Sequence, residues 1–100
     1  MEEDSILGKQ TTKADLFSDT FDKQGEIILY EKGFKIEYNG KQSKAPYDYI
    51  QSMNKVGDAA LGKIKVSLNV FDMIGMSNDY IISIPDQIYN VLKRRWEDSK

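Results

Sequence analysis

The chain has 100 residues, a net charge of −2 and neither cysteine nor histidine, and its acidic and basic residues are interspersed. This size predicts one hydrophobic core, and the mixed charge produces no broad field that would attract nucleic acid or anionic lipid. The missing cysteine and histidine exclude disulfides and thiolate chemistry and remove the commonest zinc ligands.

These exclusions predict a cytoplasmic protein without a metal ion or another cofactor. The acidic residues 2–4 carry no apolar segment of the signal-peptide type. No later stretch approaches the roughly 20 apolar residues of a membrane span. We therefore expect a soluble chain, and the composition gives no preference between monomer and dimer.

The first part of the chain has the weakest pattern. Residues 1–10 are polar except for Ile6 and Leu7, and we expect a flexible or loosely docked arm there. A single domain over residues 11–100 would follow. Between residues 11 and 21 the apolar side chains fit neither the helical nor the strand period, and an edge strand or a short helical turn would account for them.

The next two segments are typical of a β-hairpin. Residues 26–31 are rich in β-branched and aromatic side chains, and residues 34–38 alternate between apolar and charged side chains. The connection ends in Gly33, which indicates a type I turn with this glycine in the left-handed region.

A third strand is expected to complete an antiparallel meander. Asn39 and Gly40 are the favoured pair for a type I′ hairpin turn. The returning strand should reach residues 47–53 after Pro46, because proline is confined to strand starts and sheet edges.

The second half of the chain contains the clearest strand. Residues 54–62, with two glycines and two adjacent alanines, indicate a flexible connection. Residues 73–79 should form a turn, and residues 80–84 should form the last strand. The clearest strand lies before that turn, over residues 64–72. Its side chains alternate regularly, and those that face the core should be Ile64, Val66, Leu68 and Val70.

A helix is expected to close the chain. It should begin at Pro85 and Asp86, since proline lacks an N–H that a first helical turn would leave unpaired. The acidic start and the basic residues 93–95 both complement the helix dipole. Its apolar stripe must be buried against an open end or face of the sheet and consists of Ile88, Val91, Leu92 and Trp96.

The chain has a recognisable order of strands, tight turns and a capping helix. This order is carried by residues 25–30, 32–34 and 45–50 and by the helix with Trp96. This order resembles the pleckstrin-homology-like superfold, particularly its GRAM and bacterial or archaeal variants. The resemblance implies a mainly β fold with one C-terminal α-helix, an antiparallel β-sandwich or partly open barrel capped by that helix. The family has seven strands, whereas the pattern here predicts six.

The sequence favours no enzyme class. Asp48 with Asp58, or Asp72 with Asp79, could act as acid and base only if the two carboxylates converged in a pocket. Residues 57–63 have the spacing and the lysine of a phosphate-binding loop but lack its serine or threonine, and a strand follows. We therefore expect no catalytic residues, no cofactor-binding residues and a protein without enzyme activity.

Two regions are candidates for contact with a protein or peptide partner, and we expect an interaction or adaptor module. The first is a turn that concentrates large apolar side chains, namely Phe71, Met73, Ile74 and Met76. The second is the helix flank with Tyr89, Lys93 and Trp96, although a large aromatic side chain at a helix end, such as Trp96, more commonly covers the core. In peptide-binding members of the superfold, the groove between the helix and its neighbouring strand takes an added ligand strand.

The alternative is a module that binds anionic lipid weakly at a membrane surface. Its candidate residues are Lys32, Lys35, Lys41 and Lys44. Phosphoinositide-binding members of the superfold carry a basic run in the first hairpin, whereas residues 18–25 here contain two acids and one lysine. Lysines on a solvated hairpin would also protect an edge strand from aggregation.

Overall fold

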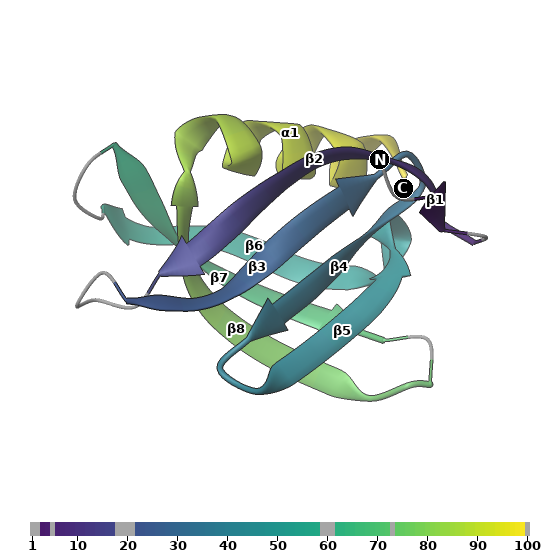
Figure 1. Cartoon of the computed structure of the whole chain (residues 1–100), viewed down its shortest axis with the longest axis horizontal. Helices are drawn as coiled ribbons and strands as arrows, with labels where there is room; N and C mark the ends of the chain where they lie inside the picture. Colours follow the sequence, from purple (N-terminus) through teal and green to yellow (C-terminus); the bar gives the residue numbers. More distant parts are fainter. Residues whose placement is uncertain (1–2, 5, 18–21, 59–61, 73, 100) are drawn as a thin grey trace.

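The structure is a computed structural model, and it describes residues 3–4, 6–17, 22–58, 62–72 and 74–99. The described residues form a mainly antiparallel β structure with one C-terminal helix, as the sequence predicts (Figure 1). In chain order the elements are β1 (Glu3–Asp4), β2 (Gly8–Phe17), β3 (Lys23–Tyr30), β4 (Gly33–Tyr38), β5 (Lys41–Pro46), the 3-10 turn η1 (Tyr47–Tyr49), β6 (Ile50–Asp58), β7 (Lys63–Phe71), β8 (Ser77–Pro85) and α1 (Asp86–Asp98).

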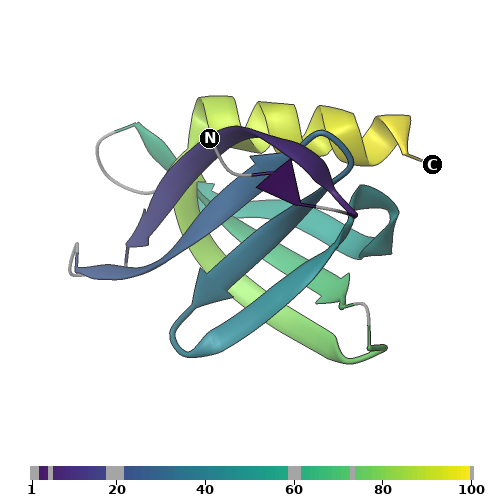
Figure 2. The same ribbon diagram turned by 45° about the vertical axis from the view of Figure 1, so that its right-hand side comes forward.

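The strands pair in the order β5-β4-β3-β2-β8-β7-β6, and β1 pairs with the start of β2. All neighbours in this order are antiparallel. The ladder between β2 and β8 is short, with Phe17 opposite Ser83. At this narrow link the sheet turns back on itself, so that strands β2–β5 lie across strands β6–β8, with α1 running along one side of both groups (Figures 1 and 2).

The hydrophobic core lies between these two groups of strands. The alternation expected in β7 is confirmed, since Ile64, Val66, Leu68 and Val70 are all buried. From the other group, β3 and β4 supply buried side chains to the same cluster, namely Ile27, Leu29, Phe34 and Ile36. Each such side chain contributes roughly 1.5 to 3 kcal/mol when fully buried, so the core fixes the strands on which the surface residues stand.

The beginning of the domain is a strand where the sequence pattern was ambiguous. Residues 8–17 form β2, which pairs with β3 along its length rather than forming a helical turn. In the segment expected to be an arm, Leu7 is fully buried and packs with Ile28 and Tyr30 in a second cluster. The Leu7 carbonyl also accepts a hydrogen bond from the Lys32 amide.

The meander is present, but its third strand differs from the prediction. Strand β5 occupies residues 41–46, and Pro46 ends it at the sheet edge instead of preceding a strand. Residues 47–49 form η1, because the chain must turn from β5 into β6 on the other group of strands. The type I′ turn is consistent with positive φ angles of 54° at Asn39 and 85° at Gly40.

Two further boundaries are corrected. Residues 54–58 continue strand β6 and are not a connection, while residues 59–61 lie outside the described part. Strand β8 begins at Ser77, three residues before the predicted start, because its ladder with β7 extends to Phe71. Gly33 does not have a positive φ, so the expected left-handed glycine is wrong.

Helix α1 covers the core mainly through Leu92, which is fully buried, while Ile88 and Trp96 pack at its margin. Val91 is 38% exposed, so its predicted place in the buried stripe is wrong. Tyr89 packs against the core in its stead. Within the described residues, no helix has the length and apolar character to cross a bilayer.

Candidate functional site

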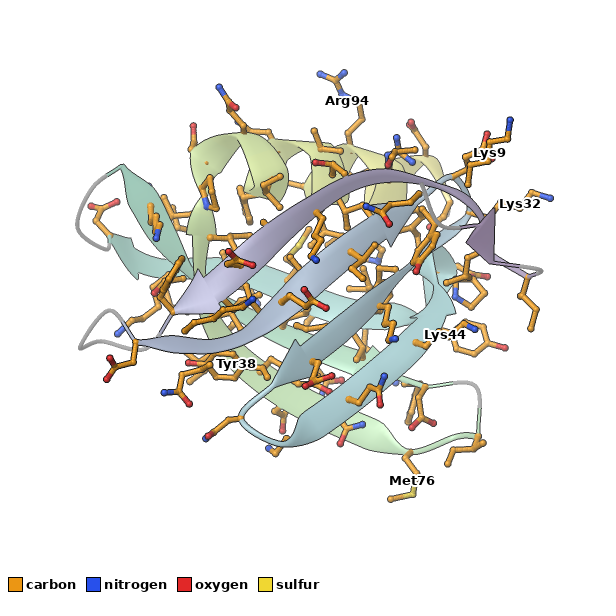
Figure 3. The ribbon with its side chains drawn as sticks, in the orientation of Figure 1. Lys9, Lys32, Tyr38, Lys44, Met76 and Arg94 are labelled. Atoms are coloured by element: carbon orange, nitrogen blue, oxygen red, sulfur yellow. The ribbon has the colours of Figure 1, made fainter. Side chains whose placement is uncertain are left out.

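The turn between β7 and β8 presents three exposed apolar side chains, among them the most exposed large apolar side chain of the described residues, Ile74. Ile74 is 84% exposed, Met76 58% and Phe71 37%. Figure 3 shows the Met76 side chain projecting away from the body of the protein. We call Phe71, Ile74 and Met76 the apolar turn; Met73, also expected here, lies outside the described residues.

Asp72 holds the apolar turn in shape. Its Oδ1 accepts hydrogen bonds from the backbone amides of Ile74, at 3.0 Å, and Met76, at 2.9 Å. The Asp72 amide donates to the Met76 carbonyl, and Gly75 supplies the positive φ, 88°, that the reversal requires. The apolar side chains are therefore exposed to water on a turn that is fixed by hydrogen bonds. A bound partner would remove this apolar surface from water.

A groove of about 760 Å³ lies beside the apolar turn, between it and η1. We call it the acidic groove, because Asp48 and Asp72 contribute carboxylates to it and none of its described lining residues is basic. The other lining residues are Tyr49, Ile50, Gln51, Phe71 and Gly75. Sequence reasoning missed the η1 side of this groove, because no local pattern indicates that residues 48 and 72 approach each other.

A second, smaller groove of about 330 Å³ lies against the same turn, lined by Gln42, Lys44, Asp72 and Ile74. Asp72 therefore contributes to both grooves, and Ile74 stands at the margin of the second. The apolar turn thus forms a ridge between two grooves, and a protein or peptide partner could bind it with a surface of complementary shape.

The aromatic side chains of the helix flank pack against the core, whereas the side chains of the apolar turn are exposed. Trp96 packs at the core, and its Nε1 donates a 2.8 Å hydrogen bond to the Ile50 carbonyl. Tyr89 also packs at the core, and the Lys93 Nζ lies 5.9 Å from its ring centroid. Trp96 therefore acts on the acidic groove indirectly, by fixing the first residue of β6 in its wall.

The four candidate lipid-binding lysines do not form one patch. Lys35 and Lys44 are direct cross-strand neighbours, and Lys32 lies at the same end of the β4–β5 pair as Pro46. Lys41 lies at the opposite end of the pair, about 17 Å from the Pro46 end along the six residues of β4, and its Nζ is 3.5 Å from the Asp79 carbonyl. Figure 3 shows Lys32 and Lys44 on the same side of the molecule.

The aspartate pairs considered from the sequence have other positions. Asp48 lies in η1 and Asp58 is the last residue of β6, so the nine-residue strand separates them by roughly 27 Å. Asp79 accepts a hydrogen bond from the Asn69 side chain, while Asp72 holds the turn. Within the described residues, no three acidic side chains are grouped so as to hold a metal ion.

A third groove, of about 480 Å³, lies near the end of α1 and has mixed charge, with Glu31, Lys32, Arg94 and Asp98 among its lining residues. At its base, the Tyr47 hydroxyl and Arg95 Nη1 both donate to the Tyr30 carbonyl, at 2.6 and 2.8 Å. Burial raises the pKa of Tyr47, although the neighbouring Arg95 opposes this shift. These contacts join η1 and α1 to β3 and satisfy a buried carbonyl.

No family model matches the chain, and no curated protein or solved structure matches it either.

Proposed function

We propose that this protein is a non-enzymatic interaction module of the pleckstrin-homology-like superfold, acting as a cytoplasmic adaptor, and that it docks a protein or peptide partner through the apolar turn. The fold assignment is supported by the strand that the sequence pattern left ambiguous. With β2 included, the long strands number seven among the described residues, the number in that superfold, and a helix follows the last of them.

The arrangement of these elements also supports a helix-capped sandwich or partly open barrel. Strands β2–β5 and β6–β8 enclose one core, and their ladder at Phe17 and Ser83 is short. Leu92 closes the core from the helix side. A rigid scaffold of this kind suits an adaptor, because binding residues are most often carried on loops that such a scaffold positions.

The observation that carries the docking proposal is the exposure of Ile74 and Met76 on a turn fixed by Asp72. Turns at hairpin ends are usually polar, and exposed apolar patches on small proteins frequently mark binding surfaces. Methionine is suited to such a surface, because its flexible thioether adapts to different partners. A fixed turn would also lose little conformational entropy on binding.

Peptides selected from a displayed random library on the intact protein would test this surface. Ile74→Ser and Met76→Ser should each weaken the selected peptides about five- to tenfold, since truncation of a central contact costs on the order of 1 kcal/mol or more. The matched controls are Val56→Ser and Ile81→Ser, at positions 54% and 58% exposed elsewhere. Peptides that lose affinity only with the control variants, or with none of the four, would contradict docking at this turn.

Binding to anionic vesicles is the competing activity. Sedimentation with phosphatidylserine vesicles should show no salt-sensitive binding, because the candidate lysines are spread along the β4–β5 pair, with Lys35 and Lys44 in its middle and Lys41 at one end. Binding that disappears at physiological salt and with Lys35→Gln or Lys44→Gln would favour the lipid-binding alternative over protein docking.

A further inference from the structure

We propose that the acidic groove takes a lysine or arginine side chain of the docked partner, while apolar residues beside that side chain lie against the apolar turn. This inference rests on the proposed docking function and defines its partner as a segment with a basic anchor between apolar residues. The groove and the apolar turn share Phe71, so one short segment can contact both.

Charge complementarity argues for the basic anchor. Asp48 and Asp72 contribute two carboxylates to the groove, and its described lining residues contribute no cation. The turn amides of Ile74 and Met76 both bond to the same oxygen of Asp72, Oδ1. A guanidinium group carries five N–H donors in a planar fork and is suited to engage carboxylates, and a lysine ammonium carries three donors.

The aromatic residues of the groove add a second attraction for a cation. Tyr49 is 38% exposed and Phe71 37% exposed, so both rings are accessible to a ligand. The faces of such rings attract lysine and arginine side chains, and they also pack against the aliphatic stems of these side chains. The same two carboxylates would repel an anionic bilayer or a nucleic acid, which leaves a basic protein segment as the occupant.

The wall opposite the apolar turn is positioned by the helix. Trp96 bonds to the Ile50 carbonyl and fixes the first residue of β6, directly after the 3-10 turn that carries Asp48 and Tyr49. The groove therefore has a fixed backbone on both sides, and side-chain rotation accounts for most of its adaptability. A preformed site of this kind lowers the cost of ordering on binding.

Two synthetic peptides test the anchor: acetyl-Gly-Ile-Arg-Ile-Gly-amide and its analogue with neutral citrulline in place of arginine. In nitrogen–proton correlation spectra of the intact protein, the arginine peptide should shift amides within residues 48–51 and 71–75. We expect its affinity to be at least about fivefold higher than that of the citrulline peptide, and to fall as salt is raised.

Asp48→Asn should weaken the arginine peptide about two- to fivefold, the range for an exposed ion pair, and should leave the citrulline peptide unaffected. Asp72→Asn should act in the same direction, because the asparagine oxygen can still accept the two turn amides. Asp58→Asn is the matched control, since it removes one charge from a side chain 83% exposed at the far end of β6.

Equal affinity for the two peptides, shifts confined to other residues, or no binding of the arginine peptide would each overturn the basic anchor. The peptide comparison uses the unchanged protein and therefore decides the matter even if a variant fails to fold. Equal binding of both peptides at residues 71–76 would overturn the anchor alone, whereas selected peptides indifferent to Ile74→Ser and Met76→Ser would overturn the docking surface itself.

Discussion

Gly33 shows how a single residue can be required for its lack of a side chain rather than for its backbone conformation. Its φ is not positive, in contrast to Gly40 and Gly75. A Cβ atom at position 33 would overlap the Ala45 carbonyl oxygen, a methyl of Leu7 and the Cα of Pro46. The glycine therefore allows strand β5 and the segment before β2 to approach the start of β4 closely.

We predict that Gly33→Ala lowers the free energy of unfolding by about 1 to 3 kcal/mol, because the neighbouring backbone must shift to admit the methyl group. Gly57→Ala is the control, since a Cβ there would contact nothing within 4 Å, and it should change stability by less than about 0.5 kcal/mol. Urea unfolding of both variants measures the difference. Similar stability of the two variants would contradict the close approach.

At the scale of elements, the sequence predicted best those strands whose buried face is apolar. Strand β7 alternates regularly because Ile64, Val66, Leu68 and Val70 all face the core. Strand β2 was ambiguous because its more buried face carries Gln10, Thr12 and Ala14 before Leu16, so burial and polarity do not coincide. Strand β6 was shortened in the prediction because its edge position and two irregularities in its ladder accommodate glycine and polar residues.

The candidate site was predictable only in part, because half of it depends on contacts between segments that are distant in the sequence. Local composition identified Ile74 and Met76, since exposed apolar residues in a turn depart from the usual chemistry of turns. The acidic groove depends on Asp48 and Asp72, which come together only when η1 and the β7–β8 turn meet in the folded chain. Such long-range contacts leave no periodic signal in a single sequence.

Helix α1 offers a test of the face that it buries. Leu92 is fully buried, whereas its neighbour Val91 is 38% exposed. Leu92→Ala should therefore lower the free energy of unfolding by about 2 to 5 kcal/mol through the cavity that it leaves. Val91→Ala should cost less than about 1 kcal/mol, and thermal or urea unfolding of the two variants would reveal a reversed order if the helix were rotated.

At the scale of the whole molecule, side chains join strands that the sheet does not pair. Ser43 on β5 and Tyr80 on β8 share a buried 2.7 Å hydrogen bond, and Asn78 donates to the same serine oxygen at 3.0 Å. Strands β5 and β8 are separated by three others in the pairing order. This polar contact therefore ties the two groups of strands together across one side of the core, where a lost partner would leave a buried polar group unsatisfied.

The burial of Tyr80 makes the stability of the protein depend on pH in the alkaline range. Burial raises the pKa of Tyr80 above its ordinary value of 10.0, the hydrogen bond with Ser43 opposes the shift, and the Asp72 carboxylate adds to it. Above pH 10 the folded protein thus retains a proton on Tyr80 that the unfolded chain loses. The contribution of Tyr80 to the free energy of unfolding is therefore complete below pH 10 and declines as the pH rises further. Tyr80→Phe should cost about 0.5 to 1.5 kcal/mol at neutral pH and should reduce the decline at alkaline pH.

Urea unfolding at about pH 8 and about pH 11 would measure this decline in the wild type, in Tyr80→Phe and in Tyr49→Phe, a control at a tyrosine 38% exposed. The control should lose as much stability between the two pH values as the wild type, and Tyr80→Phe should lose less. Because Tyr47 is also buried with a raised pKa, some decline should persist in Tyr80→Phe. An equal decline in all three proteins would mean that the tyrosine linking β8 to β5 does not hold its proton more tightly in the folded state.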